Sequence, residues 1–258
     1  PPPEAKRAAV LGEFGGLGLP VRGHTWQDEK NWGYRSFTDA GALTDAYVDL
    51  LRELRLLAGQ GLCAAVYTQT TDVEVEVNGL LTYDRAVEKM DRARVRAANL
   101  ALRRPPPKVD VVVPCAPHGH VTWRFVTESP GDGWQRPEFD DAGWQEGPGG
   151  FGTRGTPGAR VGTEWRTGAL WLRRRFTLPA DVDPATLWLV VHHDEDAVVC
   201  VNGVEVARLP GYRTSYGFRP LPPEAARAFR VGDNVLAVHC TQTAGGQFID
   251  VGFVAVRE

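Results

Sequence analysis

The first hundred residues alternate between short apolar runs and amphipathic segments. Residues 8–11 and 63–67 are short apolar runs, each followed by a polar loop, which is typical of buried strands. Apolar residues recur every three or four positions from about Asp39 to Ala58, and residues 84–102 are rich in Ala, Arg and Lys, so both segments are predicted helices. The order strand–loop–helix, repeated once, predicts an α/β fold whose two loops follow the carboxyl ends of parallel strands. Such folds place their chemistry there.

This first half has too few strands to enclose a core. Two short strands and two helices leave an open sheet edge and an uncovered apolar layer. We therefore expect residues 1–103 to be the C-terminal part of a larger α/β domain. The sequence starts without Met and without an apolar signal segment, so we also expect a truncated or processed chain.

A different hydrophobic period marks the second half. Prolines are frequent in residues 104–120, which predicts an extended linker, because proline fixes φ and lacks a hydrogen-bond donor. From residue 121 onward, short apolar runs alternate with turns. Two of these runs flank Asn202-Gly203, a dipeptide that predicts a two-residue type I′ hairpin. The pattern predicts an all-β sandwich over residues 121–258.

Composition narrows the class of partner. The chain is 43% hydrophobic and 24% charged with a net charge of −3, which is typical of a soluble globular protein and favours neither nucleic acid nor an anionic membrane as partner. It contains no run of about 18 apolar residues that would span a membrane. Cys63, Cys200 and Cys240 lie in apolar runs, where cysteine is usually a small buried hydrophobe. A disulfide between Cys200 and Cys240 is a further possibility if their two strands are neighbours.

Glu13 is the strongest candidate for chemistry. It follows the first apolar run and lies among glycines, in the sequence Gly-Glu-Phe-Gly-Gly, so backbone could approach a ligand closely beside its carboxylate. The alternative is an ordinary ion pair with an arginine such as Arg22. The loop that follows offers flat aromatic faces and donors, which suit the C–H faces and hydroxyls of sugars. Its residues are Arg22, His24, Trp26, Trp32 and Tyr34, although each aromatic alone is more often a packing residue.

A second acidic group follows the second strand. Asp72 and Glu74 lie nearest the strand end, where a substrate-binding carboxylate would sit. Glu74 and Glu76 alternate with valines, however, so a solvent-facing strand edge explains them more simply and is the favoured interpretation.

Three further motifs in the second half favour structural roles. Residues 192–196, His-His-Asp-Glu-Asp, have the residue types of a metal site, but neighbouring histidines on a strand point in opposite directions, so we favour a polar loop. Trp134 and Trp144 are expected to be structural aromatics of the sandwich. The run 173–175, three arginines, is expected on a solvated sheet face.

Two segments of the first half resemble glycoside hydrolase family 2, which includes β-galactosidases, β-glucuronidases and β-mannosidases. Residues 12–16 resemble the nucleophile segment on the seventh strand of the (β/α)8 TIM barrel of that family. Residues 64–74 together with 78–85 resemble its eighth strand and loop, and this second run is the more specific. Residues 121–258 resemble the galactose-binding-like jelly roll that these enzymes carry, here placed after the barrel. The resemblance thus implies the C-terminal strands and helices of a TIM barrel followed by a jelly-roll β-sandwich.

The resemblance implies a retaining hydrolase of β-linked glycans or glycosides, with a carbohydrate substrate, no cofactor and Glu13 as nucleophile. Family members hold the acid/base as a Glu after an Asn on the fourth strand, and this sequence contains no Asn-Glu pair. The chain alone is therefore expected to lack turnover and to need the remainder of its own barrel upstream. Export in a bacterium, to the periplasm or beyond, is also implied. The expected substrate-binding residues are Arg22, His24, Trp26, Trp32, Tyr34, Gln69, Asp72 and Glu74.

Two alternatives stay open. The working unit could be a carbohydrate-binding or purely structural sandwich attached to a barrel remnant, in which case residues 121–258 decide the function. A complete enzyme that uses Glu13 with Asp72 and Glu74 is less favoured, because two strands cannot enclose a substrate. Turnover by the purified chain would support it.

Overall fold

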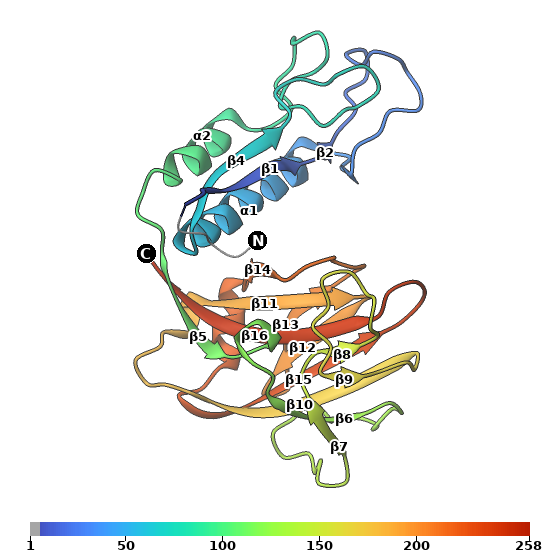
Figure 1. Cartoon of the computed structure of the whole chain (residues 1–258), viewed down its shortest axis with the longest axis vertical. Helices are drawn as coiled ribbons and strands as arrows, with labels where there is room; N and C mark the ends of the chain where they lie inside the picture. The colour runs from blue at the N-terminus through green and yellow to red at the C-terminus, as the bar shows by residue number, and fades with distance from the viewer. Residues whose placement is uncertain (1–5) are drawn as a thin grey trace. The chain divides into compact units, whose positions relative to one another are not determined.

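The structure, a computed structural model, describes residues 6–258. The first five residues, part of the start that led us to expect truncation, lie outside this range. The chain divides into two compact units, residues 1–108 with Glu258 and residues 109–257. Most of the regular structure is β-sheet, with few helices, and the second unit is a β-sandwich (Figure 1).

The first unit is built on two parallel strands, β1 (Ala9–Gly15) and β4 (Leu62–Thr68). The predicted first strand was too short, because β1 continues through Glu13 to Gly15. Helix α1 (Ala40–Gly59) confirms the predicted helix, and the Asp39 side chain caps it by accepting a hydrogen bond from the Ala42 N–H. Two short strands, β2 (Leu17–Gly18) and β3 (Arg35–Ser36), pair with each other in the loop between β1 and α1.

Helix α2 (Arg92–Ala101) is shorter than predicted. The predicted start at residue 84 was wrong because Asp84 belongs to a turn, in which its carboxylate accepts hydrogen bonds from the Thr82 hydroxyl and the Ala86 N–H. The helix begins after Asp91, whose side chain caps the Arg94 N–H. Its Arg- and Lys-rich composition alone did not reveal this boundary.

The core of the first unit lies between α1 and one face of the two strands. Leu11, Phe14, Ala65 and Tyr67 pack against a row of apolar residues on α1. The buried α1 residues in this core are Leu43, Ala46, Tyr47, Leu51 and Leu54.

The second unit packs two antiparallel-rich sheets face to face, as the sequence predicted for a sandwich (Figure 1). One sheet has the order β13-β12-β15-β10-β6-β7, and the other has the order β14-β11-β16-β8-β9, with β5 pairing to β16. The first sheet contains β6 (Thr122–Val126), β7 (Gln145–Pro148), β10 (Ala169–Leu178), β12 (Ala197–Val201), β13 (Val204–Leu209) and β15 (Gly232–Thr241). The second contains β5 (Lys108–Val113), β8 (Phe151–Gly152), β9 (Thr163–Glu164), β11 (Leu187–Asp194), β14 (Gly217–Pro220) and β16 (Phe248–Arg257). Three 3₁₀ turns are η1 (Ala116–His118), η2 (Pro184–Thr186) and η3 (Pro223–Ala228).

Several details of the sandwich test the sequence predictions. Asn202 and Gly203 both have positive φ, 51° and 86°, which confirms the type I′ hairpin between β12 and β13. Part of the predicted linker is instead strand β5, because valines at alternate positions find a partner in β16. All four cysteines are free: β12 and β15 do pair, but Cys200 lies opposite Ala237, out of register with Cys240. Cys63 is exposed, against expectation.

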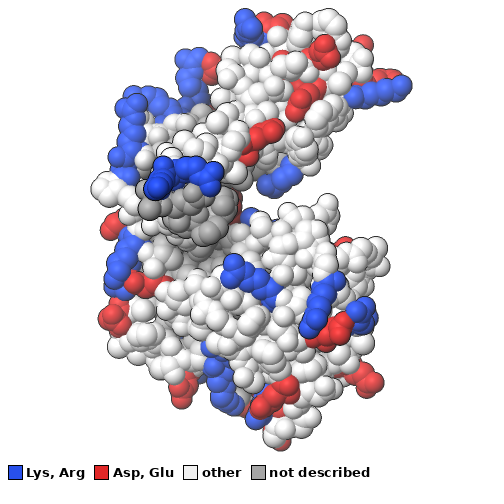
Figure 2. Space-filling view, in the orientation of Figure 1, with Lys and Arg blue, Asp and Glu red and all other residues white. Residues whose placement is uncertain are grey.

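Charge is mixed on both units. On the face shown in Figure 2, acidic and basic side chains both occur on each unit, in keeping with the net charge of −3. Among the helices of residues 6–258, none has the length and apolar character needed to cross a bilayer.

Candidate functional site

Glu13 lies at a β-bulge near the carboxyl end of β1. Between Leu11 and Phe14 the strand advances three residues while its partner advances two, from Ala65 to Tyr67, so one extra residue is accommodated beside Glu13. Bulges of this kind re-aim a side chain and are frequent next to active sites. Leu11 and Phe14 pack toward α1, whereas Gly12 and Glu13 between them are exposed, which places Glu13 on the face of the sheet away from α1.

The Glu13 carboxylate is exposed and available. Within the described range, 6–258, it forms no ion pair with Arg22, which is the arrangement that the simpler interpretation required. Gly15 and Gly16 follow with φ of 120° and 68°, and a Cβ at Gly16 would lie 2.6 Å from the Tyr34 ring. The glycines therefore allow the Tyr34 ring to sit directly against the backbone that follows Glu13.

The face of the sheet that carries Glu13 is apolar and bare. Val10 and Val66 on this face are 55% and 52% exposed, and Ala64, which lies opposite Val10, is also exposed. Strands of parallel sheets are normally covered on both faces. Of the two faces, residues 6–108 cover the one that packs against α1.

The loops after β1 and β4 interlock through their backbones. The Leu19 N–H donates to the Val77 carbonyl at 2.9 Å, and Trp32 both donates to Val75 and accepts from Val77. The two loops therefore form one body at the carboxyl ends of the strands, as the strand order predicted.

A buried ion pair fixes this body, and it involves a residue that the sequence did not single out. Lys89 Nζ donates to Asp72 Oδ1 at 2.6 Å, to the Val77 carbonyl at 2.8 Å and to the Leu19 carbonyl at 3.2 Å. Asp72 also accepts from the Gly79 N–H at 2.7 Å. Burial raises the pKa of Asp72 and lowers that of Lys89, and the ion pair opposes both shifts.

The acidic segment 72–76 does not form the predicted strand edge. Asp72 is 2% exposed, and Val73 and Glu76 close a tight turn by exchanging backbone hydrogen bonds. Glu74 lies at the exposed tip of this turn with φ of 50°. Alternating valines and glutamates suggested a strand, but the buried Asp72–Lys89 pair decides the local fold. The contacts that Asp72 makes are internal, and a contact with substrate stays a prediction.

Four exposed aromatic side chains lie on the loops, and we call them the aromatic rim: Trp26, Trp32, Tyr34 and Tyr83. Trp26 meets Tyr83 edge to face with centroids 4.9 Å apart, and Trp32 meets Tyr34 in the same way at 5.4 Å. The Trp26–Tyr83 pair joins the two loops. The structure thus brings the predicted aromatics together in two pairs and adds Tyr83.

His24 lies beside this rim and bonds to Asp84, with Nδ1 and Oδ2 2.8 Å apart. Hydrogen bonds from the Thr82 hydroxyl, His24 and the Ala86 N–H lower the pKa of Asp84 to about 2. Asp84 therefore stays ionised at any ordinary pH. Tyr83 and Asp84 were within the segment that resembled the eighth-strand loop, which was the one available signal for them.

Gln69 and Arg22 complete the predicted set. Gln69 is half-buried and donates to Asn78 Oδ1 at 2.8 Å, while Asn78 donates to Glu76. Arg22 is exposed on the first loop. A direct role of either residue with substrate stays a prediction.

The motifs of the second unit take structural places. Residues 192–194 are the end of strand β11 and do not form the predicted loop. The His192 ring packs against Tyr216 and Phe248. His193 Nδ1 lies 2.9 Å from the Glu195 carbonyl oxygen. The part of the chain described, 6–258, holds no cluster of three His, Cys, Asp or Glu side chains suited to a metal. Arg173 is buried, not solvated as predicted, because the segment around Trp134 and Phe139 covers it.

Comparisons with known proteins identify structural neighbours only. No protein-family model matches the chain, and no curated protein sequence matches it. Similar solved structures include a glycosyl hydrolase family 2 member from Bacteroides cellulosilyticus (19% identity, TM-score 0.38, covering 52% of this chain and 20% of that one). A Bacteroides uniformis β-glucuronidase has 17% identity and a TM-score of 0.39, covering 58% and 18%. A β-glycosidase from Bacteroides vulgatus has 16% identity and a TM-score of 0.36, covering 57% and 20%. The chain spans about a fifth of the length of each.

Proposed function

We propose that the first unit is the closing part of the catalytic barrel of a retaining glycoside hydrolase and that Glu13 is its nucleophile. The observation that carries this proposal is the position of Glu13: a bulge directs its exposed carboxylate to the bare face of a parallel sheet, at the carboxyl end of its strand. In (β/α)8 barrels, catalytic residues occupy this position.

The bare sheet face supports a barrel in particular. Val10, Ala64 and Val66 are small or β-branched, which is the composition of side chains that fill a barrel interior. The opposite face packs on α1, as strands of a barrel pack on the outer helices. We propose that further strands of the same protein, outside this sequence, cover the bare face and complete the barrel.

In the proposed reaction, Glu13 attacks the anomeric carbon while the bond from that carbon to the leaving oxygen breaks. A carboxylic acid about 5–5.5 Å away donates its proton to the leaving oxygen. The same group, now a carboxylate, then takes a proton from water, whose oxygen attacks the anomeric carbon and releases Glu13. This acid/base belongs to the part of the barrel outside this sequence, so the chain alone should show no turnover.

The loops supply substrate contacts of the expected chemistry. Trp26, Trp32, Tyr34 and Tyr83 offer flat apolar faces on which the C–H faces of pyranose rings can stack. The ionised Asp84 and its partner His24 offer an acceptor and a donor for hydroxyls beside the Trp26–Tyr83 pair. We propose a β-linked glycan or glycoside as substrate, because the sequence resemblance covers both strand ends of this unit.

Covalent trapping tests the proposal. The natural protein that contains this chain would be treated with 2-deoxy-2-fluoro-β-D-galactosyl, mannosyl and glucuronyl fluorides, digested with trypsin and analysed by mass spectrometry. Trypsin should release residues 8–22, a peptide in which Glu13 is the single carboxylate side chain. We expect one of the reagents to add one fluoroglycosyl mass to this peptide and to abolish turnover.

The matched control is Glu13→Gln, which removes the nucleophile while keeping the shape of the side chain. This variant should lose the label and most of the activity, whereas Asp49→Asn, at an exposed position of helix α1 outside the predicted substrate-binding set, should keep both within a few-fold. Label on another peptide, or wild-type turnover by Glu13→Gln, would overturn the assignment.

A further inference from the structure

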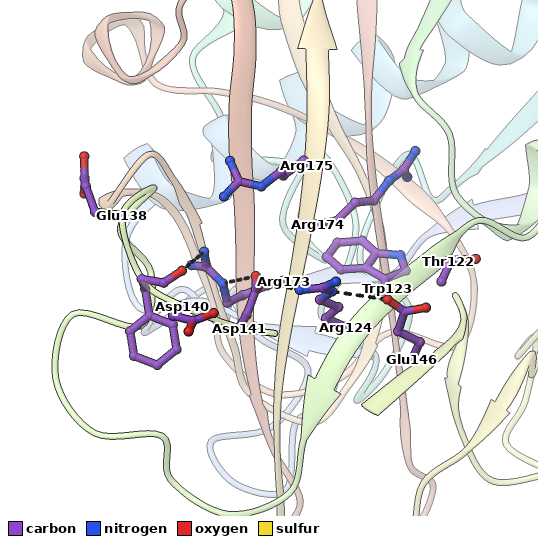
Figure 3. A pocket seen from close by; sticks show the side chains of 11 residues that line it. Thr122, Trp123, Arg124, Glu138, Asp140, Asp141, Glu146, Arg173, Arg174 and Arg175 are labelled. Atoms are coloured by element: carbon purple, nitrogen blue, oxygen red, sulfur yellow. Dashed lines mark hydrogen bonds and ion pairs between the residues drawn. The ribbon is translucent and has the colours of Figure 1, made fainter. Parts of the chain in front are cut away.

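The sandwich contains a hollow of about 570 Å³, separate from Glu13 and its loops. It lies where β6, β7 and β10 meet the segment 138–141, and its volume falls within the range of small-molecule sites (Figure 3). Four arginines and four acidic residues line it, so the lining carries no net charge.

One side of the hollow is a closed network of ion pairs. Asp141 accepts from Arg173 Nε and from Arg124 Nη1, both at 2.7 Å, and Arg124 Nε bonds to Glu146 at 3.2 Å (Figure 3). The Arg173 side chain is fully buried and also donates to the carbonyls of the covering segment, including that of Arg136 at 3.1 Å. These groups satisfy one another and make a fixed wall.

Two lining side chains of opposite charge stay apart instead of pairing. In Figure 3, Glu138 and Arg175 project from different segments with no interaction drawn between them. Among residues 6–258, Glu138 has no hydrogen-bond or ion-pair partner, and the single contact of the Arg175 guanidinium is the Pro137 carbonyl at 3.4 Å. Asp140 uses one oxygen to cap the Ala142 N–H at 3.0 Å, which leaves the other for a ligand.

We propose that this hollow binds a neutral saccharide through adjacent hydroxyl groups. A hydroxyl can donate to a carboxylate and accept from a guanidinium, so neighbouring hydroxyls on one ring can bridge Glu138 and Arg175. An anionic ligand would meet repulsion from Glu138 and Asp140, and a cationic ligand would meet repulsion from Arg175. The mixed lining therefore selects a polar, uncharged molecule with both donors and acceptors.

The same geometry sets the expected affinity. The Phe139 ring is occupied, since it lies against Trp144 and under the Arg173 guanidinium, so it offers no free platform for stacking. Without stacking, binding rests on a few hydrogen bonds from exposed groups. We expect a dissociation constant in the millimolar range, about 1 mM or weaker.

Ligand-observed NMR on the full chain tests this site. Saturation transfer would be measured with methyl β-D-galactopyranoside, methyl α-D-mannopyranoside and methyl β-D-xylopyranoside as neutral probes, and with methyl β-D-glucuronide as the anionic probe. At least one neutral probe should bind, and Glu138→Gln and Arg175→Gln should each weaken it about tenfold or more, the factor that a lost charged hydrogen bond gives. Glu128→Gln, an exposed carboxylate two residues after β6 and outside the lining, is the matched control and should bind as the wild type does.

Three results would overturn the proposal: no binding of any neutral probe, binding that both lining variants leave unchanged, or tighter binding of the glucuronide than of every neutral probe. The proposal is independent of the barrel assignment. Trp26→Ala, which removes one ring of the aromatic rim, should leave this binding intact, so the result separates binding in the hollow from binding at the loops of the first unit.

Discussion

The two units cover their strands differently. In the sandwich, nine of the ten residues of β16 are buried, because the strand is packed on both faces. In the first unit, β1 and β4 are packed on one face by α1, while Val10 and Val66 on the other are more than half exposed. The sandwich is therefore a finished domain, whereas the α/β unit presents the kind of strand face that other proteins bury.

Both units nevertheless use the same device to fix an irregular segment, a buried cation that bonds to one carboxylate and to several backbone carbonyls. Lys89 does this with Asp72, and Arg173 does it with Asp141. The difference lies in the carboxylate: Asp141 keeps a second partner, Arg124, while Asp72 pairs with no other cation among the residues that the structure describes, 6–258. Loss of the cation should therefore cost more in the first unit.

The largest effect is expected for Lys89→Met. It leaves Asp72 buried without a cation and removes donors from the Leu19 and Val77 carbonyls, so the first unit should lose about 3–5 kcal/mol of unfolding free energy. Arg173→Met should cost the sandwich less, about 2–3 kcal/mol, because Arg124 still neutralises Asp141. Urea denaturation followed by tryptophan fluorescence measures both.

Glu205→Gln in the exposed Glu205–Arg208 pair is the control for these two variants, with an expected change below about 1 kcal/mol. Equal losses for Lys89→Met and Arg173→Met would contradict the role given to Arg124. Losses no larger than that of the control would show that neither pair stabilises its unit.

The next effect is a pH dependence of the stability of the sandwich, which comes from a buried histidine. Burial lowers the pKa of His192 in the sandwich to about 4 from an ordinary value of 6.5, and the charges of His193 and Arg213 act in the same direction. As pH falls below 6.5, the His192 imidazole is protonated in the unfolded chain before it is protonated in the folded one. The folded state is therefore at full stability above pH 6.5 and loses stability as pH falls toward 4. The loss should be about 3 kcal/mol.

Thermal unfolding of the wild type and of His192→Leu at pH 7, 6, 5 and 4 measures this dependence. From pH 6.5 to 4, the unfolding temperature of the wild type should fall steadily relative to that of the leucine variant. Titration of nearby Asp250, whose pKa burial raises, is common to both proteins and cancels in the comparison. A constant gap across this range would show that His192 does not carry the pH dependence.

Local patterns in the sequence were sufficient for part of the fold. The leucine spacing predicted α1, and Asn202-Gly203 predicted the hairpin, because each signal is contained within a few residues. The start of α2 was wrong because the turn at Asp84 competes with helix formation there. The sequence also gave no sign of Lys89, since its partners lie 17 and 70 residues away.

The candidate site divides in the same way. Glu13 was visible because glycines flank it after an apolar run, whereas its direction depends on a bulge that only the pairing with β4 reveals. Asp72 was expected at the strand end because it follows the second apolar run, but its burial beside Lys89 depends on a residue 17 positions further along the chain. Elements with a local signal, a helical period or a turn dipeptide, were predictable, whereas side chains fixed by partners far along the chain were not.

The most direct test of the central claim, that further strands of the same protein cover the bare face of β1 and β4, is the reactivity of a thiol placed on it. The variant Val66→Cys, made with Cys63→Ser so that the exposed native thiol does not compete, would be reacted with a maleimide both in this chain and in the natural gene product. The account predicts rapid reaction in this chain and a rate lower by about 100-fold or more in the natural protein, where the face lies inside a closed barrel. Equal reactivity in the two would contradict it.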